Sequence, residues 1–270
     1  MRLRQRRMWR PMRRPLKRRL RAGSRCRRRL ILIRRACSQR RRPVLSQQFS
    51  TPWAWPYLAC SAFALAAAGG VATERPEIFR SYLGDIGVVP AIGALALVGL
   101  VAIAALRVSA FFRASRLGKR GVICGGLAVA AFALSAIVAD VALRFPHDIN
   151  VALPSALLFY PAIAFVVEVA LHAMPLALLL TVLRAAAPAL VAACVVAVAL
   201  IEPLFQVRGA LAVGSIAAID LFTFAQVFAF NLFELHVFRR FGFVPMYAVR
   251  VSYYLCWHVL WGTARLSLLF

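Results

Sequence analysis

Acidic and histidine side chains lie inside or at the edges of long apolar segments in the second half of this chain. They are Glu168, His172, Glu202, Asp220, Glu234 and His258. An ionised side chain at the centre of a bilayer costs about 2.5–3.5 kcal/mol even on the insertion scale. Side chains with that cost usually face the interior of a helix bundle and pair with one another. We therefore expect a site between helices that performs acid–base or metal chemistry.

The first candidate pair is Glu168 and His172, which are separated by four residues. This spacing places both side chains on one face of a helix. Pro175 follows and cannot donate a backbone hydrogen bond, so it frees the carbonyl of Leu171. A polar pair beside an open helical turn resembles the broken helices that line sites within membranes. The alternative is a hydrogen-bonded pair that only locks two helices together.

A second polar pair lies near the end of the next apolar segment. Glu202 and Gln206 share a helical face, and Pro203 frees the carbonyl of Ala199. Glu202 is a candidate catalytic residue. The alternative is a hydrated side chain at the membrane interface.

The segment 211–238 carries a polar stripe. Asp220, Thr223, Asn231 and Glu234 lie close together in helical angle, whereas His236 points to nearly the opposite side. A polar stripe within a membrane must face protein or water. Glu234 is thus a candidate for the interior of the bundle, and His236 is expected at the interface.

The last apolar segment carries Arg250, Tyr254 and His258 at intervals of four residues. His258 lies deep within the segment, so it is a candidate catalytic residue, with a hydrogen-bonded core histidine as the alternative. Arg250 could extend to the interface, or it could neutralise one of the acids.

These side chains must be positioned by membrane-spanning helices. Of the 270 residues, 62% are hydrophobic, compared with about 45–50% in soluble domains. The sequence predicts an all-α, polytopic transmembrane helix bundle of about seven spans. The spans are expected at 53–72, 86–106, 121–143, 153–183, 186–205, 211–238 and 244–266.

The distribution of basic residues predicts the orientation of these spans. The loop 107–120, Arg184 and the pair Arg239 and Arg240 fall on one side and hold eight basic residues. The other side holds five, which are Arg75, Arg80, Arg144, Arg208 and Arg265. Because cytoplasmic loops are richer in Lys and Arg, we expect a cytoplasmic N-terminus. The predicted location is a bacterial inner membrane, with the lipid bilayer as the surrounding partner.

The first 50 residues form a separate basic tail, followed by the transmembrane domain at 51–270. Residues 1–43 contain nineteen arginines, Lys17 and no acid, and they account for 20 of the net charge of +25. We expect a disordered, solvated tail or a start site placed too far upstream. The alternatives are binding to an anionic membrane surface and, less favoured, to nucleic acid. Nucleic acid is not an expected partner, since no nucleic-acid-binding fold follows the tail.

The segment 145–264 resembles the CAAX-protease and bacteriocin-processing (CPBP or Abi) family of intramembrane glutamic proteases. That family carries a Glu-Glu-x-x-x-Arg motif, then Phe-x-x-x-His, then a late His-x-x-x-Asn. Val167 to His172 is similar to the first motif, although Val167 replaces its first Glu and His172 replaces its Arg. Glu234 stands where the second motif has His, and His258 resembles the late histidine but has Gly262 in place of its polar partner.

The resemblance implies a protease that cleaves membrane-associated peptides or proteins with an activated water. Glu168 would activate the water, and His258, with His172, would orient it or stabilise the oxyanion. The resemblance requires neither a cofactor nor a metal. Two alternatives remain: a transporter component with Glu168, His172 and Asp220 as a proton or cation relay, and a metal or haem site at His172 and His258. The sequence does not predict the substrate or the oligomeric state.

Overall fold

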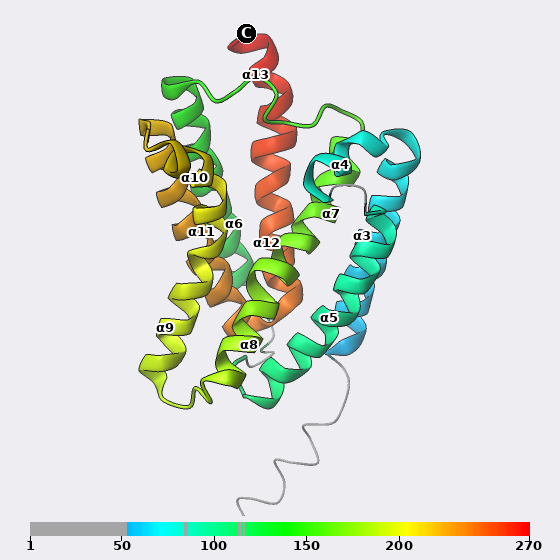
Figure 1. Cartoon of the computed structure of the whole chain (residues 1–270), viewed down its shortest axis with the longest axis vertical. Coiled ribbons are helices and arrows are strands. Elements are labelled where there is room, and N and C mark those ends of the chain that lie inside the picture. The colour runs from blue at the N-terminus through cyan, green and yellow to red at the C-terminus, as the bar shows by residue number, and fades with distance from the viewer. Residues whose placement is uncertain (1–52, 84–85, 113–114, 116) are drawn as a thin grey trace, which may run out of the picture. The chain divides into compact units, whose positions relative to one another are not determined.

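The computed structural model describes residues 53–83, 86–112, 115 and 117–270 of the chain. These residues form helices and no strands (Figure 1). The predicted basic tail lies outside the described residues. The prediction of an all-α polytopic bundle is confirmed.

Most of the predicted spans correspond to one helix or to a broken helix. The helices are α3 (Ala54–Glu74), α4 (Pro76–Leu83), α5 (Val88–Val108), α6 (Lys119–Leu143), α7 (Ala156–Val167), η2 (Glu168–Ala173), α8 (Met174–Val182), α9 (Pro188–Ala199), α10 (Ile201–Val213), α11 (Ala218–Phe241), α12 (Phe243–Tyr254), η3 (Leu255–Trp261) and α13 (Gly262–Leu268). The segments η2 and η3 are π-helical turns that connect α-helices without a loop.

Five helices are long and apolar enough to cross a membrane, and a sixth span results if the bent pair α9 and α10 is counted as one. The predicted count of seven spans is not confirmed. The difference is the run from α12 to α13, which is long but carries Arg250, His258 and Arg265, and which is not among the qualifying helices.

The outward faces of the spans are apolar. On α5, Leu97 is 69% exposed and Val101 is 70% exposed, and on α6 Leu127 is 67% exposed. Large apolar side chains exposed along whole helices are expected where the surrounding solvent is lipid. The helices therefore have the surface of an integral membrane protein.

The polar side chains instead concentrate around α12, which is the central helix of the bundle. It contacts α3, α6, α7 and α11, and in Figure 1 it lies between α11 and α3. Tyr247 on α12 donates a hydrogen bond to the carbonyl of Pro161 on α7 at 2.9 Å. Any long side chain that projects from α12 toward these neighbours is therefore surrounded by protein.

Two predicted helix breaks have structural counterparts. The π-helical turn η2 lies directly before Pro175, whose missing N–H and bulky ring disturb the hydrogen bonds of the preceding turn. The pair α9 and α10 bends by 43° at Leu200, close to Pro203. Both breaks lie beside candidate polar residues.

Arg265 does not lie in a loop between spans, as its use in predicting the orientation assumed. It lies in α13, where it is fully buried. Its guanidinium pairs with Asp140 inside the bundle, so it does not report on the side of the membrane.

Candidate functional site

Arg250 on α12 lies at the centre of a buried cluster of three carboxylates. Its Nε donates to Glu168 Oε1 at 2.6 Å, its Nη1 donates to Glu202 Oε1 at 3.1 Å, and its Nη2 donates to Glu234 Oε2. The three acids come from η2, α10 and α11, so one side chain connects four segments of the bundle. Arg250 was predicted either to reach the interface or to neutralise one acid, and in the structure it contacts three acids.

Two uncharged groups complete the environment of the guanidinium. Arg250 Nη2 donates to Asn231 Oδ1 at 3.0 Å, and Nη1 donates to the Tyr254 hydroxyl at 3.2 Å. Arg250 is only 2% exposed. A guanidinium has five N–H donors in a rigid fork, which lets it hold several acceptors in fixed relative positions.

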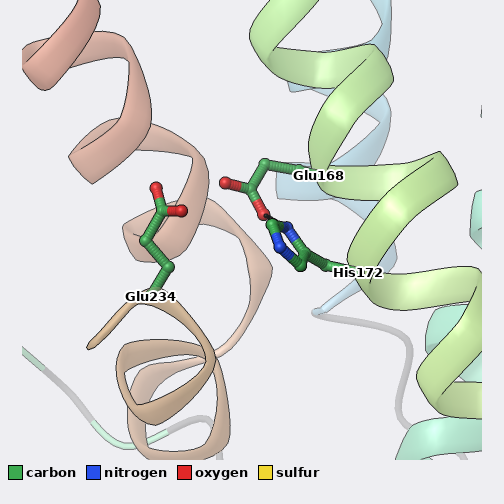
Figure 2. A group of neighbouring side chains, drawn as sticks. All are labelled: Glu168, His172 and Glu234. Atoms are coloured by element: carbon green, nitrogen blue, oxygen red, sulfur yellow. Dashed lines mark hydrogen bonds and ion pairs between the residues drawn. The ribbon is translucent and has the colours of Figure 1, made fainter. Parts of the chain in front are cut away.

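His172 extends the cluster on the side of Glu168. Its Nδ1 lies 3.0 Å from Glu168 Oε2, and its Nε2 lies 4.0 Å from Glu202 Oε2. Figure 2 shows Glu168 and His172 projecting from one helix toward Glu234 on another. One ligand atom from each of these three residues lies within 4.8 Å of the others. The predicted pairing of Glu168 and His172 on one helical face is therefore observed in the structure.

The bend between α9 and α10 places Glu202 in the cluster. Pro203 frees the carbonyl of Ala199, as predicted, and Asn231 Nδ2 donates to that carbonyl at 3.1 Å. Glu202 is 4% exposed, so the alternative of a hydrated interfacial carboxylate is not observed. Asn231 thus links the helix break to Arg250.

Three donor or acceptor atoms of the cluster lack a hydrogen-bond partner within the part of the chain that the structure describes. They are His172 Nε2, Glu202 Oε2 and Glu234 Oε1. The three carboxylates and one guanidinium also leave two negative charges uncompensated when all are ionised and His172 is neutral. Buried polar groups are normally paired, so unpaired atoms next to acidic groups make this cluster the candidate functional site.

His258 lies away from this cluster, in η3. Its Nδ1 lies 2.6 Å from Asn150 Oδ1, and its ring stacks on Tyr160 with centroids 4.6 Å apart. Gly262 permits this arrangement, since a Cβ there would lie 2.9 Å from the Asn150 side chain. The expected direct partnership of His258 with Glu168 and His172 is replaced by these contacts. The ring of Tyr254, which contacts both His258 and Arg250, is the nearest link.

Two further polar residues lie outside the cluster. Asp220 Oδ2 accepts a hydrogen bond from the Ala217 N–H at 2.9 Å, so Asp220 satisfies the start of α11. His236 is exposed, as its predicted interfacial position requires. The predicted stripe on α11 is therefore divided between a helix start at Asp220 and the buried pair Asn231 and Glu234.

A second buried arginine forms a different kind of contact. Arg265 donates to Asp140 through Nε at 2.6 Å and Nη2 at 2.8 Å, and to the carbonyls of Pro146 and Phe145. Asp140 also accepts from Trp261 Nε1 at 2.8 Å and from the Phe145 N–H at 2.9 Å. One charge meets one charge here, and each carboxylate oxygen is occupied.

Sequence reasoning did not identify Arg250 as the centre of the site, nor Asp140 and Arg265 as a pair. Both arginines lie within a long apolar segment, where a charged side chain either reaches the interface or pairs with an acid. Their place in the sequence was therefore the available signal. Comparisons with protein-family models, curated proteins and solved structures find no match.

Proposed function

We propose that the chain is a membrane-embedded hydrolase that cleaves peptide bonds of membrane-associated substrates with water activated by His172 and its acidic neighbours. The single observation that carries this proposal is the 4.0 Å separation between His172 Nε2 and Glu202 Oε2, neither of which has a hydrogen-bond partner among the described residues. The resemblance to intramembrane glutamic proteases supports the same reaction class.

Glu168 fixes the state of His172 that this reaction needs. Glu168 Oε2 faces His172 Nδ1, and a carboxylate accepts the hydrogen on that nitrogen. Neutral His172 then carries its lone pair on Nε2, which is the acceptor that a general base requires. A carboxylate that orients an imidazole in this way recurs in hydrolases of unrelated fold.

The distance between the two unpaired atoms suits a bridging water molecule. Hydrogen bonds of water have lengths of about 2.8 Å, so one water can contact two atoms that lie 4.0 Å apart. In the proposed reaction His172 Nε2 takes a proton from this water as its oxygen attacks the carbonyl carbon, and the proton then passes to the leaving nitrogen. Glu202 Oε2 orients the water.

Glu168 is a positioning residue in this scheme, which changes the role that the resemblance implied. Arg250 occupies Glu168 Oε1, and His172 occupies Glu168 Oε2, so neither oxygen is available to take a proton from water. His258, which bonds Asn150 and stacks on Tyr160, is not assigned a step.

Glu202 is the least buried of the three acids of the cluster. It retains 4% exposure, whereas Glu168, His172 and Glu234 are fully buried. Its Oε1 accepts a hydrogen bond at 3.2 Å from Gln206, which is an exposed residue of α10. We propose that substrate and water approach between α10 and α11 at this point.

The alternative of a proton or cation relay requires a continuous path of titratable groups. Asp220, its third expected member, forms the start of α11, outside the cluster. Hydrolysis requires only the groups that the cluster already brings together, so it is the preferred function.

Mapping of new peptide N-termini in cells that express the chain tests the proposal. We expect a set of cleaved membrane-protein termini with the unaltered chain and its loss with His172→Asn and Glu202→Gln. The matched control is His236→Asn, the same substitution at an exposed histidine, which should retain the cleavages. Equal sets of termini for all four chains would contradict the proposal. Proton or cation flux that depends on His172, without cleavage, would favour the relay.

A further inference from the structure

We infer that the Arg250 cluster binds one divalent metal ion of the zinc class through His172, Glu202 and Glu234. The atoms that would face the ion are the three atoms of this cluster without a hydrogen-bond partner in the described part of the chain: His172 Nε2, Glu202 Oε2 and Glu234 Oε1. With the ion bound, His172 Nε2 would be a ligand, and the ion would replace His172 as the activator of the water; in that respect the inference rests on the proposed function. The binding of the ion itself does not depend on it.

The donor set has the composition of a catalytic metal site. It combines one imidazole nitrogen with two carboxylate oxygens, and catalytic zinc sites commonly have three protein ligands from these types and keep one position open for water. All three residues are at least nine-tenths buried. Mixed nitrogen and oxygen donors favour transition metals over Mg²⁺ or Ca²⁺, which prefer oxygen alone.

Two separations between these side chains are close to those of ligands on a single ion. His172 Nε2 and Glu202 Oε2 lie 4.0 Å apart, and a His172 ring nitrogen lies within 4.8 Å of a carboxylate oxygen of Glu234. Zinc bonds to nitrogen and oxygen are about 2.0–2.2 Å long, so two ligands on one ion lie at most about 4.3 Å apart. The first separation is within this limit, and the Glu234 carboxylate would rotate toward the ion to complete the set.

The other atoms of the same side chains are already held in place. Glu168 pairs with His172 Nδ1, and Arg250 holds Glu202 Oε1 and Glu234 Oε2. Metal-binding histidines almost always donate their second ring nitrogen to a carboxylate or carbonyl, and metal-binding carboxylates are hydrogen-bonded in turn. Each candidate ligand therefore has one oriented atom and one uncommitted atom.

Charge balance supports a divalent rather than a monovalent ion. With all three acids ionised and His172 neutral, the cluster carries three negative charges and the single positive charge of Arg250. One divalent ion would neutralise the remaining two charges inside a region where uncompensated charge is costly. Arg250 is thus compatible with a bound metal ion, because its single positive charge compensates only one of the three carboxylate charges.

The test is Zn²⁺ binding to the tag-free, full-length protein in detergent after removal of metals with a chelator. We expect about one tightly bound Zn²⁺ per chain and visible absorption bands of a nitrogen- and oxygen-ligated ion with Co²⁺ as the probe. His172→Asn and Glu234→Gln should each weaken Zn²⁺ binding by tenfold or more and abolish those bands. His236→Asn and His258→Asn are the matched controls and should bind as the unaltered chain does.

A single symmetric peak in gel filtration and an unchanged melting profile establish that each variant is folded. Glu202→Gln, at the least buried of the three ligands, is the second acid variant if Glu234→Gln fails this check. Absence of stoichiometric binding, or equal Zn²⁺ affinity in the unaltered chain and in His172→Asn, would overturn the inference. If binding fails while His172→Asn still eliminates cleavage, the hydrolase proposal stands without a metal.

Discussion

Arg250 and Arg265 lie on the same helical run and are both buried, but their surroundings differ in charge and in hydrogen bonding. Arg265 meets one carboxylate, Asp140, and two backbone carbonyls, and a tryptophan N–H donates to the same Asp140. Arg250 meets three carboxylates, and unpaired atoms remain beside it. A closed, charge-balanced network stabilises a fold, whereas an acid-rich network with unpaired atoms is equipped to bind or react.

Removal of Arg250 should have the largest effect on stability. Breaking a buried ion pair by deleting one partner costs about 3–5 kcal/mol, and Arg250→Met leaves three acids without their cation. We expect this variant to lose its folded state or to melt at a much lower temperature than Arg265→Met, which leaves one acid. Thermal unfolding in detergent measures both variants.

A compensating substitution sharpens this difference. Asp140→Leu should restore part of the stability lost in Arg265→Met, because no buried charge then remains in that network. Glu168→Gln should not restore Arg250→Met to the same extent, since Glu202 and Glu234 keep their charges. Equal recovery in the two pairs would contradict the contrast.

Glu168→Gln alone separates positioning from fold. Gln has a single amide oxygen, so it cannot accept from both Arg250 Nε and His172 Nδ1, and the charge that stabilises the imidazole is lost. We expect cleavage to fall by about 10–100-fold, less than the loss of about 10²–10⁴ expected for His172→Asn. Turnover per folded molecule is the measurement. A larger loss for Glu168→Gln than for His172→Asn would return the role of base to Glu168.

Gly262→Ala tests the arrangement around His258. An added Cβ would lie 2.9 Å from the Asn150 side chain, so we expect a loss of about 1–2 kcal/mol from overpacking. Gly126→Ala in α6 is the matched control, since a Cβ there meets nothing within 4 Å. The two variants are compared by thermal unfolding in detergent. An unaltered melting temperature for Gly262→Ala would show that Asn150 moves without cost.

Asp220→Ala should have the smallest effect. It removes the acceptor for the Ala217 N–H at the start of α11, which corresponds to about 0.5–1 kcal/mol. Cleavage per folded molecule should remain unchanged, because the hydrogen bond of Asp220 goes to the Ala217 N–H and not to the Arg250 cluster. Loss of proton or cation flux in this variant, measured in vesicles, would instead support the relay.

The helical bundle could be predicted from apolar segment length, because a bilayer requires spans of a fixed minimum length. The pairing of Glu168 with His172 could be predicted from their spacing. The free carbonyl of Ala199 could be predicted from the presence of Pro203. The convergence of Glu202 and Glu234 on Arg250 could not, since it depends on how α10, α11 and α12 pack. The position of His258 could not be predicted from the sequence either, because it depends on the contact with Asn150 and on the space at Gly262.

The most direct test of the account compares Glu202→Gln with Asp140→Asn in purified, reconstituted protein. Each variant removes one carboxylate charge from one of the two arginine networks. The measurement is the rate of cleavage of a membrane peptide identified from the mapped termini, per folded molecule. We predict a loss of about 100-fold or more for Glu202→Gln and a rate within about threefold of the unaltered chain for Asp140→Asn. Equal rates for the two variants, or a loss confined to Asp140→Asn, would contradict the assignment of chemistry to the Arg250 cluster.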